Sequence, residues 1–157
     1  QGLNIVTGGK ILSIMLFCAV LSRIIFGYIS DIIGPLKTLL IGSTLQMITL
    51  ILFIPFNTLT GLYVVSILFG LSQGGIVPSY ALIVKKYLPN KDAAERIGLI
   101  IFFTIIGMSI GGWMSGKIYD YTNSYTLGFL NSILWNLLNV IIIFYLFVSF
   151  KKSKVSI

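Results

Sequence analysis

Five apolar stretches of roughly 20 residues each dominate this sequence, and a stretch of that length is what an α-helix needs to cross a lipid bilayer. They cover approximately residues 7–30, 38–56, 61–84, 97–119 and 127–150. Hydrophobic residues make up 57% of the chain and charged residues 10%, whereas about a quarter of the residues of a soluble domain are charged. The sequence therefore predicts one all-α membrane domain over residues 1–157, with five transmembrane helices.

The composition excludes several classes of function. The net charge is +7, but the basic residues lie between apolar spans and not on one hydrated face, so we expect no nucleic-acid partner. With no histidine and with Cys18 as the one cysteine, neither a zinc site nor a Cys–His pair can be built. No paired carboxylates or Ser–Lys dyad lie at mid-span. We expect no metal, no cofactor and no enzyme activity.

The basic residues predict the orientation in the membrane. If the five helices alternate in direction, one side carries eight basic residues: Lys37, Lys85, Lys86, Lys91, Arg96, Lys151, Lys152 and Lys154. Only Lys10 and Lys117 fall on the other side. The positive-inside rule makes the richer side cytoplasmic, so the amino-terminal end is predicted to be external and the tail cytoplasmic, in a cell membrane. No signal peptide precedes the first span, and we expect the chain to be a fragment.

The stretch "SRIIFGYISDIIGPLK" places charges inside the first apolar run. Arg23 precedes Asp31 by eight residues, which puts it about 12 Å deeper in the membrane. A buried arginine costs at least ~2.5 kcal/mol and normally faces the protein interior or a watery cavity. Arg23, Gly27 and Asp31 follow i, i+4, i+8 spacing and so share one stripe of the helix. The stripe predicts a polar face of this helix against which another helix packs closely.

This stretch resembles the Gly-x-x-x-Asp-x-x-Gly signature of the major facilitator superfamily, which lies in the cytoplasmic loop after the second and eighth helices. Gly27, Asp31 and Gly34 match the signature. The family usually has Arg or Lys directly after the second glycine, whereas here Pro35 follows and Lys37 is the only basic residue of the loop. The resemblance implies that these residues form a gating loop.

The resemblance extends over nearly the whole chain. "LFGLSQGGIVPSY" is similar to the tenth helix of the family and "GMSIGGWMSGKIYDYTNSY" to the eleventh. The five spans then correspond to helices eight to twelve, which is an incomplete six-helix half-bundle without helix seven. The family implies a secondary active transporter that works by alternating access, with its substrate site between two halves. The missing amino-terminal half would be a partner, together with the lipid bilayer.

Small residues recur at intervals of four in the third and fourth spans. They are Gly70, Gly74 and Gly75 with the helix-bending Pro78, and Gly107, Gly111, Gly112 and Gly116. Such spacing is the ordinary way in which membrane helices pack closely. In a transporter the same surfaces could slide during alternating access, and the sequence leaves both readings open.

Polar side chains at mid-span need hydrogen-bond partners. Gln73 either lines a cavity and binds substrate or bonds to another helix, and both readings stay open. Four hydroxyls are weaker candidates because each can bond to its own helix backbone: Ser72, Ser79, Thr104 and Ser109. The last span carries a polar face that we interpret as structural: Asn131, Ser132, Asn136 and Asn139.

Arg23 is the second candidate substrate-binding residue. An Arg four residues before the first glycine is typical of the carboxylate-transporting branches of the family, which include monocarboxylate and oxalate–formate carriers. A guanidinium pairs with a carboxylate through two hydrogen bonds, so the resemblance favours a small organic anion as substrate. Two alternatives remain for Arg23: a carboxylate of the missing half, or a role beside Asp31 in the gate. The alternative function is a non-transporting multi-pass membrane subunit.

Overall fold

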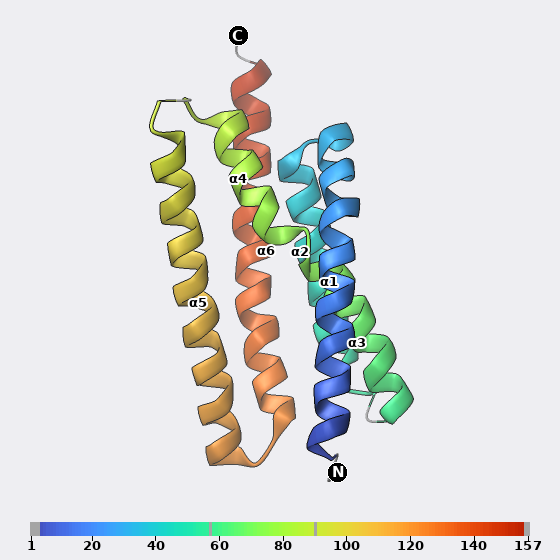
Figure 1. Cartoon of the computed structure of the whole chain (residues 1–157). Coiled ribbons are helices and arrows are strands. Elements are labelled where there is room, and N and C mark those ends of the chain that lie inside the picture. Colours follow the sequence, from blue (N-terminus) through green and yellow to red (C-terminus); the bar gives the residue numbers. More distant parts are fainter. Residues whose placement is uncertain (1–3, 57, 90, 156–157) are drawn as a thin grey trace.

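The computed structural model describes residues 4–56, 58–89 and 91–155, with side chains up to residue 150. Six helices follow one another: α1 (Ile5–Ile33), α2 (Pro35–Leu52), α3 (Leu59–Gln73), α4 (Ile76–Tyr87), α5 (Ala93–Thr122) and α6 (Tyr125–Val155). They run roughly along one common direction (Figure 1). Helices α3 and α4 continue one another, so the described residues contain five segments long and apolar enough to span a membrane. The predicted all-α architecture with five spans is confirmed.

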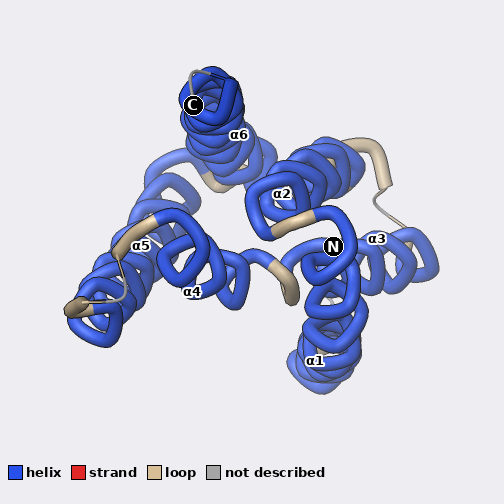
Figure 2. Tube along the Cα trace, turned by 90° about the horizontal axis from the view of Figure 1, so that it is seen from above, coloured by secondary structure: helices blue, strands red, loops and turns tan. Residues whose placement is uncertain are grey.

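Helix α2 lies near the centre of the bundle. Seen from above, it is flanked by α1 and α3 on one side and by α6 on the other, while α4 and α5 form a separate flank (Figure 2). The buried core at this centre joins α2, α4 and α6 through Leu36, Leu39, Ile76 and Ile143. Helix α2 therefore contacts α1, α3, α4 and α6.

The turn between α1 and α2 depends on a glycine. Gly34 has φ of 90° and ψ of 151°, a conformation that residues with a side chain rarely adopt. Pro35 follows at the first position of α2, where its missing N–H costs nothing and its fixed φ suits a helix. One Gly-Pro pair thus reverses the chain direction with no loop between the two helices.

Helices α1 and α3 meet through backbone-to-backbone packing. A Cβ added to Gly70 would overlap the carbonyl oxygen of Met15, and one added to Gly74 would overlap that of Ala19. Beside the second of these points the Ser22 hydroxyl donates a hydrogen bond to the Leu71 carbonyl. Small residues allow two membrane helices to come this close, so these glycines define the α1–α3 contact.

The third span is broken in its middle. Helix α3 ends at Gln73 and α4 begins at Ile76, with Gly74 and Gly75 between them. Pro78 has no N–H to donate to the carbonyl of Gly74, and its ring crowds that carbonyl. A Cβ on Gly75 would overlap the Phe26 ring. The proline and the glycines thus produce the break and let it pack against α1.

The two ends of the bundle differ in charge. The α1–α2 turn, the α4–α5 connector and the end of α6 lie at one end of the molecule (Figure 1). This end carries Lys37, Lys85, Lys86, Lys91 and Arg96. The side chains of Lys151, Lys152 and Lys154 lie outside the described residues. Lys10 and Lys117 are nearer the opposite end.

We predict that Gly74→Val destabilises the bundle by about 1–3 kcal/mol, the usual cost of overpacking a tight contact, because the new side chain must displace the backbone of α1. Gly98→Val is the matched control, since a Cβ at Gly98 has nothing within 4 Å. Titration of the purified protein with sodium dodecyl sulfate in lipid–detergent mixtures measures the free energy of unfolding of both variants. Equal stability of the two variants would contradict the close α1–α3 contact.

Candidate functional site

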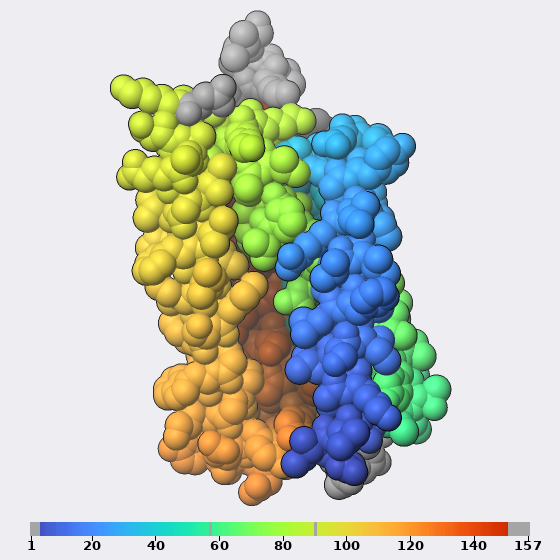
Figure 3. All heavy atoms as spheres, in the orientation of Figure 1, coloured from blue at the N-terminus to red at the C-terminus, as the bar shows by residue number. Residues whose placement is uncertain are grey.

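The larger of the two cavities described here has a volume of about 890 Å³ and lies between α2, α3, α5 and α6. Its polar lining consists of five amides and two hydroxyls: Gln46, Gln73, Asn131, Asn136, Asn139, Ser115 and Ser132. No charged residue lines it. The surface is hollowed between α5 and α1, with α6 at the floor of the hollow, in the half nearer the α5–α6 turn (Figure 3). We call this cavity the amide hollow.

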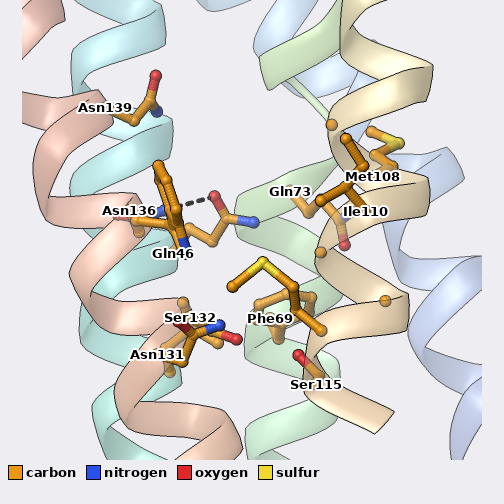
Figure 4. A pocket seen from close by; sticks show the side chains of 16 residues that line it. Gln46, Phe69, Gln73, Met108, Ile110, Ser115, Asn131, Ser132, Asn136 and Asn139 are labelled. Atoms are coloured by element: carbon orange, nitrogen blue, oxygen red, sulfur yellow. Dashed lines mark hydrogen bonds between the residues drawn. The ribbon is translucent and has the colours of Figure 1, made fainter. Parts of the chain in front are cut away.

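Two hydrogen bonds across the amide hollow tie α6 to α2. The Asn136 amide donates to Gln46 Oε1 at 2.8 Å, as Figure 4 shows, and the Asn139 amide donates to the Ser43 hydroxyl at 3.2 Å. Asn136 is 8% exposed, and its Oδ1 is buried without a partner among the described residues. Asn136 and Asn139 therefore bond to α2 and also line the hollow, so their interpretation as structural stays a prediction, and Asn136 is incompletely satisfied.

Gln73 is the last residue of α3 and lines the amide hollow. Its side chain and that of Gln46 reach into the hollow from α3 and α2 (Figure 4). Within the described part of the chain, the Gln73 amide has no hydrogen-bond partner. Gln73 was expected either to line a cavity or to bond to another helix. Among the described residues, this geometry supports the cavity-lining interpretation.

The four weaker hydroxyl candidates all bond to their own helix. Ser72 donates to Phe69 O at 2.8 Å and Ser79 to Gly75 O at 2.7 Å. Thr104 and Ser109 donate to the carbonyls four residues earlier at 2.7 and 3.0 Å. Their expected self-satisfaction is confirmed, so none of the four needs a ligand.

Four glycines of α5 have no other helix packed against them. A Cβ added to Gly107, Gly111, Gly112 or Gly116 would have no atom within 4 Å. Helix α5 contains no buried residue at all. Gly107, Gly111 and Gly112 border the amide hollow. Their role in helix packing remains a prediction, because within the described residues no helix lies against them.

Arg23 lies on the outer side of α1. Its neighbours Ser22 and Phe26 are buried, whereas Arg23 and Asp31 are exposed and a Cβ on Gly27 would have nothing within 4 Å. Arg23 does not line the amide hollow. Arg23 and Gly27 of the predicted polar stripe therefore face away from this bundle. The two candidate substrate-binding residues, Arg23 and Gln73, are not brought into one cavity.

A second, smaller cavity brings the signature loop next to lysines. It has a volume of about 320 Å³ and is lined by Ser30, Asp31, Pro35, Leu82, Lys85 and Lys86. The Lys86 ammonium would lie 3.3 Å from a Cβ placed on Gly34. Lys37, the basic residue of the loop itself, is exposed and does not line this cavity. The cations that share this cavity with the signature carboxylate come from the end of α4.

Sequence reasoning missed two of these relationships. Neither Gln46 nor the shared cavity of Asp31, Lys85 and Lys86 was predicted from the sequence. The signal for Gln46 was available, because a mid-span amide needs a partner and α6 offers a face of amides. The neighbours of Asp31 depend on how α4 folds back beside the α1–α2 turn, and no spacing along the chain indicates that.

These features define a class: a multi-pass helical membrane protein with a charged stripe on one helix and an uncharged polar hollow. The model of the Major Facilitator Superfamily matches residues 2–156. The chain therefore belongs to the Major Facilitator Superfamily, and the predicted resemblance is confirmed.

The chain is also similar to individual curated proteins. It is 25% identical to monocarboxylate transporter 13 of Rattus norvegicus over 121 residues, which is 76% of this chain and 28% of the relative. It is 28% identical to monocarboxylate transporter 10 of Rattus norvegicus over 115 residues, or 68% of this chain and 21% of the relative. The chain thus spans less than a third of the length of these relatives. No solved structure matches it.

We predict that Gln46→Leu destabilises the bundle more than Asn136→Leu does. The first change leaves the nearly buried Asn136 with neither amide atom paired, whereas the second removes that buried amide altogether. Hydrogen bonds between membrane helices contribute about 0.6 kcal/mol on average and up to about 1.7 kcal/mol. Unfolding in sodium dodecyl sulfate measures the free energy of unfolding of the two single variants and of the double variant.

The double variant Gln46→Leu/Asn136→Leu is the internal control. It should recover part of the stability lost in Gln46→Leu, because two apolar partners replace one orphaned amide. Strictly additive losses would indicate that the two amides do not interact.

Proposed function

We propose that this chain is part of a secondary active transporter that moves a small organic anion such as a monocarboxylate across a cell membrane by alternating access. The observation that carries the proposal is the family match over residues 2–156, together with two similar proteins whose names state monocarboxylate transport. The chain covers less than a third of those relatives, so further helices of the same protein would complete the transport path. Transport, and not catalysis, is the activity proposed.

Arg23 is the residue that we assign to the anion. It lies within the membrane-spanning part of α1, and it is exposed on the side of α1 away from the buried Ser22 and Phe26. An arginine at this depth is too costly to leave facing lipid, so the surface around it must meet further protein or water. A guanidinium in such a cavity can hold a carboxylate by two hydrogen bonds. The substrate site would then lie between α1 and the part of the transporter outside this chain.

Asp31 belongs in the gate in this proposal. It lies at the end of α1, beside Lys85 and Lys86 in the small cavity, and this end is rich in basic residues, which favours a cytoplasmic position. Exposed charges interact weakly because water screens them. Closing the cytoplasmic side would remove water and strengthen the attraction between Asp31 and these lysines. The carboxylate would thus stabilise the closed state without touching substrate.

We predict that Arg23→Gln abolishes or strongly reduces anion uptake by the full-length protein, because an amide cannot neutralise a carboxylate. Arg23→Lys keeps the charge but loses the planar fork, so it should retain uptake with a raised KM. The measurement is uptake of radiolabelled monocarboxylates into proteoliposomes. Normal uptake of every anion tested by Arg23→Gln would remove the binding role, and absence of uptake by the unaltered protein would favour the subunit alternative.

We predict that Asp31→Asn lowers the maximal transport rate and changes KM little. Lys86→Gln should have the same effect in weaker form, because Lys85 remains in the small cavity. Asp92→Asn is the control: Asp92 is exposed and its side chain makes no capping hydrogen bond to α5. A raised KM with an unaltered maximal rate in Asp31→Asn would instead make Asp31 a binding residue.

A further inference from the structure

The smaller cavity lies at the basic end of the bundle, beside the α1–α2 turn and the end of α4 (Figure 1). It has a volume of about 320 Å³, and its polar lining consists of Ser30, Asp31, Lys85 and Lys86. The last turn of α1, the first residue of α2 and the second half of α4 form its walls. Because the membrane spans end here, the cavity lies at the level of the lipid headgroups and not in the hydrocarbon core.

Ser30 is a buried residue that lines this cavity. It is 4% exposed, and its hydroxyl has no hydrogen-bond partner among the described residues. Other buried hydroxyls of the bundle bond to their own helix: Thr38 and Ser79 donate to the carbonyls four residues earlier at 2.9 and 2.7 Å. A buried polar group without a partner costs free energy. An acceptor oxygen of a ligand in the cavity would therefore complete the hydrogen bonding of Ser30.

Two lysines of α4 give the cavity its positive charge. Lys85 and Lys86 both line it. Lys86 Nζ would lie 3.3 Å from a Cβ placed on Gly34, so the absence of a side chain at this glycine leaves room for the ammonium above the α1–α2 turn. The carboxylate of Asp31 in the same cavity offsets one of the two positive charges. The lining therefore carries a single net positive charge, which suits a singly charged anion.

We propose that the smaller cavity is a binding site for the phosphate group of a phosphodiester. The phosphate oxygens accept hydrogen bonds from the ammonium groups of Lys85 and Lys86 and from the Ser30 hydroxyl, and such charge-assisted bonds are the stronger kind. A phosphodiester carries one negative charge and so matches the net charge of the lining, whereas a phosphomonoester carries about −1.5 to −2. The site is separate from Arg23, and the proposal does not depend on which solute is transported.

The size and the position of the cavity favour a phospholipid as the source of the phosphate. A volume of about 320 Å³ is that of roughly ten water molecules, so a phosphate fits together with part of the alcohol that it esterifies. Further basic residues of this end, Lys37, Lys91 and Arg96, attract anions toward it. Basic pockets between transmembrane helices on the cytoplasmic side bind anionic headgroups. A soluble phosphate compound is the other source, and the experiment distinguishes the two.

The test measures ligand binding to the full-length protein in a neutral detergent, as the shift of its melting temperature during a titration. The probes are short-chain phosphatidylglycerol, the diacylglycerol with the same chains but no phosphate, and inorganic phosphate. We expect phosphatidylglycerol to stabilise the protein and the diacylglycerol not to. Equal stabilisation by inorganic phosphate would support the site but make its ligand a soluble compound. Stabilisation by neither phosphate-containing probe, or equal stabilisation by the diacylglycerol, would overturn the proposal.

Four variants separate this cavity from the general charge of the surface. Lys86→Gln and Ser30→Ala should each weaken binding of the stabilising phosphate probe about fivefold, the effect of one lysine or one hydrogen bond. Asp31→Asn should strengthen binding, because it removes a like charge from the cavity. Lys37→Gln is the matched control: it removes a positive charge from the same end of the bundle, but Lys37 is exposed and does not line the cavity.

The pattern across the four variants decides the outcome. A loss of affinity in Lys37→Gln as large as that in Lys86→Gln would show attraction to the surface and no site. Unchanged binding in both Lys86→Gln and Ser30→Ala, or weaker binding in Asp31→Asn, would equally overturn the proposal.

Discussion

The approach of α3 to α1 at Gly70 and Gly74 is the contact on which the rest of the bundle depends. It brings two backbones together where no side chain intervenes, and the Ser22 hydroxyl adds a hydrogen bond to the Leu71 carbonyl within the same contact. In lipid, apolar side chains gain little by leaving the solvent, so close packing and hydrogen bonds decide which helices associate. The glycine contact therefore stabilises the association of these helices, as the hydrophobic effect stabilises the core of a soluble protein.

The break at Gly74 and Gly75 follows from the same contact and gives the third span two roles. Helix α3 stays against α1, while α4 turns toward α2 and α6 and contributes Ile76 to the buried core. Because α4 ends beside the α1–α2 turn, its last lysines come to lie next to Asp31. One interrupted helix thus links the middle of the membrane to the charged end of the bundle.

Much of this architecture was predictable because the solvent is lipid. The five spans follow from apolar length alone, and the self-bonding of Ser72, Ser79 and Thr104 follows from the reach of a hydroxyl to its own helix backbone. The neighbours of Asp31 in the small cavity were not predictable, because they come from α4, which is distant in sequence, and depend on the arrangement in space. The glycine stripe on α5 is a third case: the spacing predicts a packing surface, but no helix among the described residues lies against it.

The structure separates charge from uncharged polarity, and the separation restricts where an anion can bind. The five amides gather in the hollow between α2, α3, α5 and α6, whereas Arg23 and Asp31 lie on the exposed stripe of α1. Amides alone give a carboxylate no opposite charge, so a dehydrated anion would be poorly compensated in the hollow. Arg23 lies further from the ends of its span than Lys10, Arg96 or Lys117 does, so it is the cation that we assign to an organic anion. The two surfaces therefore need different surroundings: the amides of the hollow need neutral hydrogen-bonding groups, and Arg23 needs a cavity that admits water and substrate.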